Sequence, residues 1–416
     1  MTDLEVTVED IHQAAENIKN EALLTPLRKF RTLGQTAGCD QLFLKLECYQ
    51  RCKSFKFRGA LNKIKKIPEG STVICCSAGN HSQGVALAST ICNCKSVIYM
   101  PENATVAKVQ ATQHYGGNVI QKGPSFDDAK AEMTKELEKN PEYIFVPPFD
   151  DKDIIAGQGT IGLEILDQLP DVDTVVIPIG GGGLISGVAV AVKSAKKNVR
   201  IIGVQMASCP GCFKKFNEYK KHEKRVFARE APTPLADGIA VKVPGVINFN
   251  IIRQLVDDIV IVTEDEVALA VALLAERGKL IVEGSGAAPV AAVLNKKFKF
   301  TNNEKICCII SGGNIPLQML ARCIERALFL RKTRVELDVI IPYGTRHMTQ
   351  MLKVFVDNNV QVISCTTVSH VDTVANKDHY SVVVDFLDPS ILKTIQRKFD
   401  DFGWSYSIQS TRPVDE

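Results

Sequence analysis

Four short segments of this 416-residue sequence carry groups that could do chemistry, and each lies where an apolar run gives way to a helix-length segment. They are a lysine-containing segment at 54–60, a polar loop at 77–84, four consecutive glycines at 180–183, and a serine with two glycines at 311–314. Ligand sites in α/β proteins form where strands end and helices begin. We therefore treat the four segments as candidate parts of one site.

Taken singly, the segments differ in strength. Lys56 is one of 50 lysines and arginines, so alone it is better interpreted as a solvated surface charge. The loop at 77–84 could offer N–H groups and hydroxyls to a carboxylate, but a capped turn explains it about equally well. Four glycines in a row lose much entropy on folding, so a plain turn is a poor explanation, and bare amides at a helix N-terminus favour a phosphate. Ser311 alone is a weak signal.

The elements that must position these groups follow from hydrophobic periodicity. Up to about residue 330, nearly all-apolar strands alternate with helices, as expected for parallel sheets covered by helices on both faces. The expected strands are 72–76, 96–100, 119–121, 174–179, 200–205 and 306–310, and the expected helices are 104–115, 125–139, 154–169 and 184–196. Thr7 followed by Asp10 predicts a capping box for a helix near the start of the chain.

The pattern changes after the basic run 331–334. The expected order is then a strand at 335–343, a helix at 345–358, strands at 360–368 and 379–386, a helix at 390–402 and a strand at 404–409. The order βαββαβ is that of ferredoxin-like α+β folds. It predicts a small separate module.

Composition sets limits on the class of protein. The chain is 45% hydrophobic and 23% charged with a net charge of +3, which is typical of a folded protein and gives no overall attraction to nucleic acid or membranes. Its most apolar stretch, 267–275, falls far short of the about 20 residues that a membrane span needs. The sequence starts without the pattern of a secretory or transit peptide. Thirteen cysteines, several of them crowded, indicate reduced thiols and a cytoplasmic location.

Together and in this order, the four segments resemble the fold-type II pyridoxal-phosphate enzymes, in particular the threonine/serine dehydratase branch. The resemblance covers nearly all of the first 330 residues, and five further fragments extend it: TPL at 25–27, KLE at 45–47, AGQGTIG at 156–162, ADG at 236–238 and EGSGA at 283–287. It implies a tryptophan synthase β-like catalytic domain at 1–330 made of two three-layer α/β domains, the smaller one inserted at roughly 52–150.

The C-terminal module, 334–416, resembles an ACT-like regulatory domain, which in related dehydratases senses an amino acid or a nucleotide. The usual Asp-Arg-Pro-Gly turn after its first strand is replaced by Pro-Tyr-Gly-Thr-Arg at 342–346, where only Gly344 survives. A module that mainly packs an oligomer, a homodimer or a homotetramer, is therefore as good an interpretation as ligand sensing.

The resemblance also implies a role for each residue of the site. Lys56 would form a Schiff base with pyridoxal 5′-phosphate and later remove the substrate's Cα proton, as suits a buried amine whose pKa is lowered. Phe55 would pack on the cofactor ring, Asn80 would bond its 3′ oxygen and Ser311 its ring nitrogen. The phosphate would be held by Gly180, Gly181, Gly182, Gly183 and Leu184, and the substrate carboxylate by Ser77, Ala78, Gly79, Asn80 and His81.

The implied reaction is β-elimination of L-threonine to 2-oxobutanoate and ammonia, with L-serine to pyruvate as a side activity. Ala78 stands where serine racemases of this branch usually carry a second serine, which disfavours racemisation. His81 and Gln83 disfavour a β-replacement enzyme such as a cysteine synthase. Unusual residues beside the lysine, Cys48, Cys52 and Lys53, leave open a catalytically weak amino-acid sensor.

No metal site is expected. Gln205 and the acid-free stretch 206–211 stand where related racemases bind a divalent cation. Cys209 and Cys212 have CxxC spacing, but no second pair or histidine follows at zinc-like distance, so a redox or metal role is disfavoured. The sequence leaves open threonine against serine as the main substrate, and a biosynthetic against a catabolic role.

Overall fold

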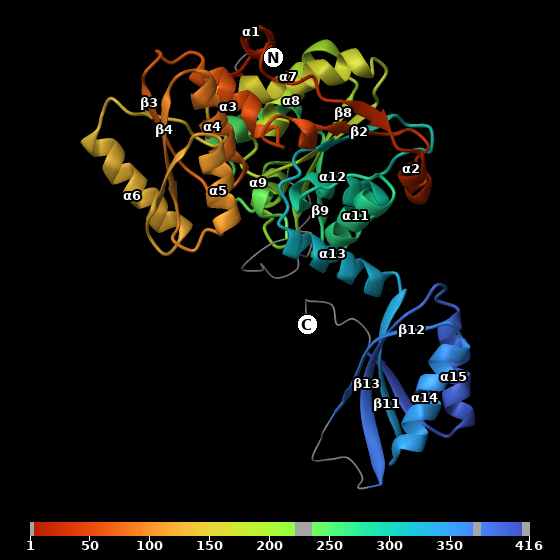
Figure 1. Ribbon diagram of the computed structural model, residues 1–416. Coiled ribbons are helices and arrows are strands. Elements are labelled where there is room, and N and C mark those ends of the chain that lie inside the picture. The colour runs from red at the N-terminus through yellow and green to blue at the C-terminus, as the bar shows by residue number, and fades with distance from the viewer. Residues whose placement is uncertain (1–3, 221–234, 369–375, 410–416) are drawn as a thin grey trace. The chain divides into compact units, whose positions relative to one another are not determined.

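The computed structural model describes residues 4–220, 235–368 and 376–409. Its internal contacts divide the chain into two units, Met1–Leu320 and Ala321–Glu416, which are called unit 1 and unit 2 below (Figure 1). This division lies within helix α13 (Leu317–Leu330), whereas the sequence suggests a boundary after that helix.

A six-stranded sheet forms the larger half of unit 1. Its strands lie in the order β1 (Leu27–Lys29), β2 (Leu42–Leu46), β10 (Ile306–Ile310), β7 (Thr174–Pro178), β8 (Arg200–Met206) and β9 (Asp258–Val262). Only β1 is antiparallel to its neighbour. The expected strands at 174–179, 200–205 and 306–310 are confirmed within one residue, while β1, β2 and β9 are not among the expected strands.

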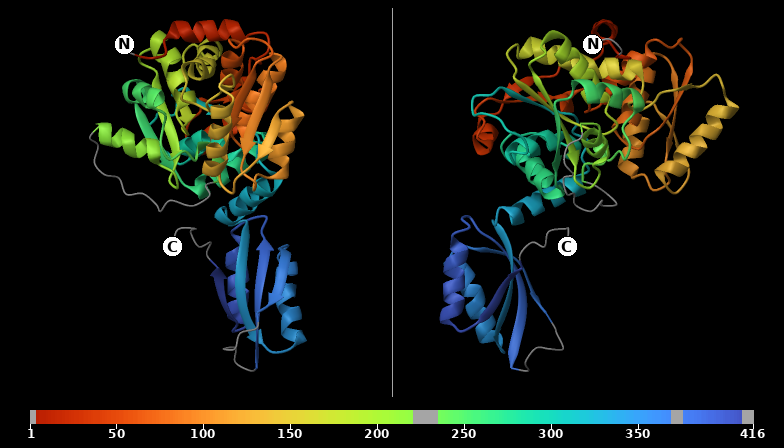
Figure 2. Two further views of the ribbon diagram at one scale, coloured as in Figure 1. Left: turned by 90° about the vertical axis from the view of Figure 1, so that its left-hand side faces the viewer. Right: turned by 180° about the vertical axis from the view of Figure 1, so that it is seen from behind.

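Helices cover both faces of this sheet (Figures 1 and 2). One layer contains α1 (Val8–Ile18), α7 (Lys152–Gln168), α8 (Gly183–Ala195), α9 (Gly211–Lys220) and α10 (Val246–Leu255), whose apolar side chains share one core with the sheet. The other contains α2 (Arg31–Ala37), α11 (Glu264–Glu276) and α12 (Gly284–Leu294). The predicted capping box of α1 is present, with the Thr7 hydroxyl accepting from the Asp10 N–H and the Asp10 carboxylate accepting from the Thr7 N–H.

A parallel four-stranded sheet forms the smaller half. Its strands lie in the order β5 (Asn118–Gln121), β4 (Lys95–Met100), β3 (Thr72–Cys76) and β6 (Ile144–Phe145). Successive side chains of a strand point to opposite faces. Val73 and Cys75 therefore pack with α3 (Lys56–Ile64) and α4 (Asn80–Ile91), while Ile74 and Cys76 pack with α6 (Phe126–Lys139). Helix α5 (Val106–His114) lies against α4 and β5, and the result is a second three-layer arrangement.

Unit 2 has the expected βαββαβ order. Its elements are β11 (Arg334–Pro342), α14 (Thr345–Asp357), β12 (Gln361–Thr367), β13 (Lys377–Asp385), α15 (Ile391–Asp401) and β14 (Ser405–Gln409). The sheet is antiparallel with strand order β12-β13-β11-β14, and both helices cover one face of it (Figure 1). The ring of Phe399 in α15 packs in the core of this unit against the rings of Phe355, Trp404 and Tyr406.

Three negative observations apply to the described ranges. No helix there is long and apolar enough to cross a membrane. No group of three or more histidine, cysteine and acidic side chains gathers there to hold a metal ion. No disulfide joins the thirteen cysteines, all of which fall inside those ranges.

Candidate active site

The structure joins the lysine segment to the serine segment. The Phe55 N–H donates to the Ser311 carbonyl at 3.0 Å, and Ser54 pairs with Gly312 in an isolated antiparallel bridge. Helix α3 begins at Lys56, directly after this bridge, and β10 ends just before Ser311. The start of a helix of the smaller half therefore meets the carboxyl end of a strand of the larger sheet, which is where the sequence predicts a site.

The Lys56 side chain is half-buried. Its Nζ donates to the Pro148 carbonyl at 2.6 Å and lies 5.3 Å from the centroid of the Phe55 ring. Burial lowers the pKa of Lys56 from 10.5 to about 8, and the negative charge of Glu283 opposes that shift. A lysine with this pKa is partly neutral near physiological pH, so it can act as a nucleophile and as a base.

The loop at 77–81 turns directly into α4. The Ser77 hydroxyl accepts from the Gly79 N–H at 3.2 Å, and the Ser82 hydroxyl donates to the Gly79 carbonyl at 2.6 Å. The His81 Nε2 lies 2.9 Å from the Val146 carbonyl, which can only accept, so this nitrogen carries the proton. Burial, and then the nearby Lys56 charge, lower the pKa of His81 to about 3. His81 is therefore a neutral donor that fixes the loop.

Asn80 is bound on both sides. Its Nδ2 donates to the two carboxylate oxygens of Glu283 at 2.8 and 3.0 Å, and its Oδ1 accepts from the Asn314 Nδ2 at 2.8 Å. The Ser285 hydroxyl also donates to Glu283, at 2.7 Å. Burial raises the pKa of Glu283, whereas the bonds from Ser285 and Asn80 oppose that rise. Sequence reasoning gave Glu283 and Asn314 no role, although both lie in fragments that carry the resemblance.

The four glycines at 180–183, here the tetraglycine loop, connect β7 to α8. A Cβ on Gly181 would lie 2.2 Å from the Phe149 ring, and one on Gly183 would lie 3.1 Å from the Phe149 carbonyl oxygen. Gly182 has φ +100°, a left-handed conformation that favours glycine, and it caps α8. The loop thus needs glycine for close packing and backbone conformation, and it leads into a helix start whose first N–H groups have no partner within the helix.

Two adjacent residues connect the lysine to the tetraglycine loop. Pro148 accepts the hydrogen bond from Lys56, and the next residue, Phe149, packs on Gly181 and Gly183. An amine of lowered pKa, an anion cradle that a Cβ would fill, and the buried Ser311 at the end of a neighbouring strand are therefore held in one place. These residues fit pyridoxal 5′-phosphate, which needs an amine, a phosphate site and a partner for its ring nitrogen.

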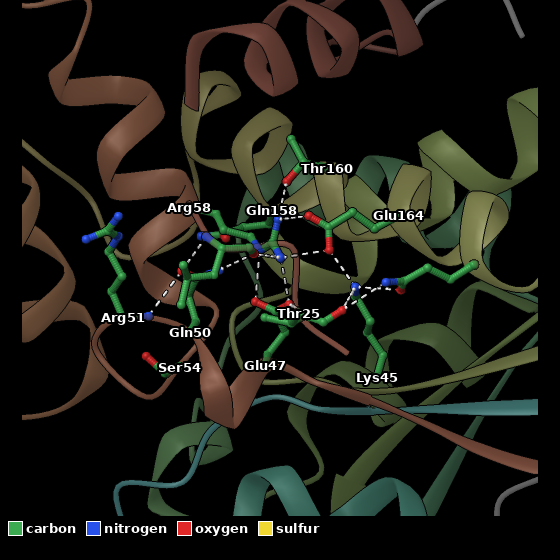
Figure 3. Close-up of polar contacts among 12 residues, drawn as sticks. Thr25, Lys45, Glu47, Gln50, Arg51, Ser54, Arg58, Gln158, Thr160 and Glu164 are labelled. Atoms are coloured by element: carbon green, nitrogen blue, oxygen red, sulfur yellow. Dashed lines mark hydrogen bonds and ion pairs between the residues drawn. The ribbon is translucent and has the colours of Figure 1, made fainter. Parts of the chain in front are cut away.

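A buried ionic network, formed by Lys45, Glu47, Arg58 and Glu164, holds α3 in place (Figure 3). Arg58 bonds Glu47 in a fork, with both distances 2.8 Å, and bonds Glu164 at 2.6 and 3.0 Å. The Lys45 Nζ also donates to the Thr25 carbonyl at 2.7 Å. Since Arg58 lies two residues after Lys56 on the same helix, the network ties the start of α3 to β2 and α7.

The unusual cysteines near the lysine are buried. Burial raises the pKa of the Cys48 thiol to about 12 and that of the Cys52 thiol to about 11. Both thiols are therefore protonated at neutral pH and are poor nucleophiles. The Cys52 carbonyl accepts from the Asn314 Nδ2 at 2.9 Å, so this residue helps to place the loop after β10.

The Gln205 side chain, near the end of β8, connects the start of α9 to Ile179, the residue before the tetraglycine loop. The Gln205 side chain accepts from the Phe213 N–H at 2.7 Å and donates to the Ile179 carbonyl at 3.2 Å. Burial raises the pKa of the Cys212 thiol to about 12. The amide of Gln205 thus serves to place the start of α9.

Comparison with known proteins bears on this site. A family model described as pyridoxal-phosphate dependent enzyme matches residues 18–312. An L-threonine ammonia-lyase of Thermotoga maritima is 40% identical over 362 residues, 86% of this chain and 88% of its own. The processed form of threonine deaminase isoform 2 from Solanum lycopersicum has 35% identity and a TM-score of 0.69, covering 78% of this chain and 92% of its own. Maize serine racemase has 30% identity and a TM-score of 0.69, over 78% and 99%. The chain belongs to the family of pyridoxal-phosphate dependent enzymes, and its cofactor is pyridoxal 5′-phosphate.

Proposed function

We propose that this chain is an L-threonine ammonia-lyase, which converts L-threonine to 2-oxobutanoate and ammonia and acts more slowly on L-serine to give pyruvate. The observation that carries the proposal is the connection of the Lys56 amine to the tetraglycine loop through Pro148 and Phe149. The names of the relatives from Thermotoga and Solanum support threonine as the substrate.

Lys56 moves the proton in this scheme. Pyridoxal phosphate, when bound, withdraws electrons from the amino acid and so acidifies its Cα proton. Lys56 Nζ removes that proton, the β-hydroxyl leaves as water, and the remaining enamine takes up one water to give the 2-oxo acid and ammonia. Neutral His81 holds the loop 77–81, whose N–H groups and hydroxyl would bind the substrate carboxylate.

The remaining residues hold the cofactor in this proposal. Residues 180–183 and Leu184 would bind the phosphate, Phe55 would pack on the ring, and Ser311 would bond the ring nitrogen. Asn80 would bond the 3′ oxygen, and its two bonds to Glu283 support this by fixing the direction of its amide. A neutral hydroxyl at the ring nitrogen leaves it unprotonated, which suits elimination.

A spectrum and a product assay test the assignment. The purified enzyme should show a visible-range absorbance band of lysine-bound cofactor, and should form 2-oxobutanoate from L-threonine. Lys56→Ala should lose both, because no amine remains to bind the cofactor or to take the proton. Lys66→Ala is the matched control, since that lysine is largely exposed and pairs with Asp153. An unchanged band in Lys56→Ala would refute the proposal.

A serine racemase activity is the second candidate, because maize serine racemase is among the similar structures. Ala78 has no hydroxyl at the position where serine racemases of this branch usually carry a second serine, so no group there returns a proton from the opposite face, which favours elimination. Chiral analysis of serine after incubation with L-serine decides between them. D-serine formed faster than pyruvate would make racemisation the main activity.

For unit 2 we propose an ACT-like module that contributes to a homodimer or homotetramer of a cytoplasmic enzyme, and that could carry an amino-acid or nucleotide effector. The βαββαβ order supports this. The Thermotoga relative matches 86% of this chain, whereas unit 1 holds only 320 of the 416 residues, so the match extends into unit 2. Activity with and without nucleotides and branched-chain amino acids tests the effector, and light scattering tests the assembly. Whether the catalytic domain ends near 330 is tested by limited proteolysis.

A further inference from the structure

Asn248, near the start of α10, contacts the tetraglycine loop through its side-chain amide. Its side chain is fully buried. Its Nδ2 donates to the Gly181 carbonyl at 3.0 Å and to the Phe149 carbonyl at 3.2 Å. One amide thus bonds both the loop and the residue that follows the lysine's partner Pro148.

The orientation of the amide is fixed by its partners. Both acceptors are carbonyl oxygens, so the nitrogen and not the oxygen must face them. The Asn248 Oδ1 is buried and has no hydrogen-bond partner. A buried acceptor without a partner destabilises a protein, and an apolar side chain would avoid that loss. The asparagine is therefore explained by its two donor bonds.

The bond to Gly181 sets the direction of the next N–H group. The Gly181 carbonyl also accepts from the Gly245 N–H at 3.0 Å, so two donors hold it toward α10. In a planar trans peptide the carbonyl and the following N–H point in opposite directions. The Gly182 N–H is therefore directed away from α10. Asn248 also lies close to the loop, since its Cβ is 2.9 Å from where a Cβ on Gly182 would stand, which leaves no room for a side chain at that position.

We propose that Asn248 is a positioning residue for the cofactor phosphate. Its amide holds the Gly181 carbonyl back, so that the Gly182 N–H and the first N–H groups of α8 face the phosphate before the cofactor arrives. Through Phe149 the same amide fixes the distance between the phosphate end of the site and Lys56. The proposal rests on the tetraglycine loop being the phosphate site.

Cofactor binding to the apoenzyme tests this without measuring turnover. Wild type, Asn248→Ala and Asn248→Ser are titrated with pyridoxal 5′-phosphate and with pyridoxal, which lacks the phosphate. Asn248→Ala should weaken binding of the phosphorylated form about tenfold, the usual effect of one lost hydrogen bond. Binding of pyridoxal should change by less than about twofold. Asn248→Ser keeps a hydroxyl donor, so its affinity for pyridoxal 5′-phosphate should lie between those of the wild type and Asn248→Ala. The serine variant supplies the measurement if the alanine variant does not fold.

Two controls separate the explanations. Ser186→Ala removes a buried bond of 3.1 Å from α8 to the Asn248 carbonyl without touching the Gly181 carbonyl, and should leave the ratio of the two affinities unchanged. Gly182→Ala strains the loop itself. If it too leaves the ratio unchanged, the loop is not the phosphate site and the underlying assignment fails. If Gly182→Ala alters the ratio and neither Asn248 variant does, or if they weaken both ligands equally, the role of Asn248 is refuted.

Discussion

Lys56 and Arg58 lie two residues apart in α3, and the protein surrounds the two cations differently. Arg58 is buried, whereas Lys56 is half-buried. Arg58 is bonded by two carboxylates, which raise its pKa above the ordinary value despite burial. Among residues 4–220, 235–368 and 376–409, Lys56 Nζ bonds a carbonyl and no carboxylate, and burial lowers its pKa to about 8. The same helix therefore carries a cation that is permanently charged and one that can lose its proton.

The carboxylates show the same contrast. Arg58 lowers the pKa of Glu47 although burial opposes this, whereas burial raises the pKa of Glu283 near Lys56. Burial penalises a charge in both places, and only direct pairing reverses the effect. Complete pairing at Arg58 gives a rigid anchor, and incomplete pairing at Lys56 gives reactivity.

Breaking the anchor should have the largest effect. Arg58→Met leaves Glu47 and Glu164 without their main partner, and the loss of one partner of a buried ion pair costs about 3–5 kcal/mol. Urea unfolding of the variant and the wild type measures this loss. A loss below about 1 kcal/mol, the range of an exposed pair, would mean that the network does not anchor α3.

The second prediction alters the charge near Lys56. The negative charge of Glu283 raises the pKa of Lys56, so Glu283→Gln should lower that pKa. The rate of cofactor attachment to the apoenzyme should then begin to rise at a lower pH than in the wild type. Wild-type attachment should rise as pH increases through about 8, where the amine loses its proton. Stopped-flow absorbance across pH gives both profiles. Glu47→Gln is the control. An equal shift of the pH profile in that variant would contradict the contrast between the surroundings of Lys56 and those of Arg58.

His81 is a further buried titratable group, and it is neutral in the folded protein. Its folded pKa is about 3 against a reference value of 6.5, so below pH 6.5 the unfolded chain binds a proton that the folded protein refuses. The His81 contribution to stability is therefore complete above pH 6.5 and is lost as the pH falls toward 3. His81→Gln should show a shallower loss of melting temperature between pH 6.5 and 4. Parallel curves would contradict a neutral, buried His81.

The smallest effect is expected at an exposed pair. Lys122 contacts Glu132, and the side chain of Lys122 is 57% exposed. Solvent screens such pairs. Lys122→Ala should leave the urea midpoint unchanged within error, and a loss comparable to that of Arg58→Met would show that burial does not explain the contrast.

The sequence predicts strands best where both faces are buried. The runs at 72–76 and 306–310 are all apolar apart from the first threonine, and the strands β3 and β10 have those bounds. Strand β2 lacks a continuous apolar run because Lys45 interrupts it. Strand β9 is apolar after its first residue, Asp258, so its pattern is that of the predicted strands although it was not among them. Lys45 is tolerated in a buried strand because Glu164, distant in sequence, pairs with it and because Thr25 and Gln168 accept further hydrogen bonds from it.

The site divides in the same way. The tetraglycine loop could be found from residue type and local spacing, whereas Lys56 was indicated only by the family resemblance. Glu283, Asn248 and Pro148 could not be found, because their roles depend on contacts between segments far apart in the chain. Pro148 acts through a backbone carbonyl, which every residue type has, so no side-chain pattern could have indicated it.

The short segment from Val146 to Asp151 serves a different neighbour at almost every position. Val146 accepts from the imidazole of His81 in the loop at 77–81, Pro148 accepts from Lys56, and Phe149 packs on two glycines. Asp150 then accepts from the first N–H groups of α10, and Asp151 caps α7. Inserting or deleting one residue here would shift all five contacts at once, whereas exchanging Phe149, Asp150 or Asp151 would remove only the contact that this side chain makes.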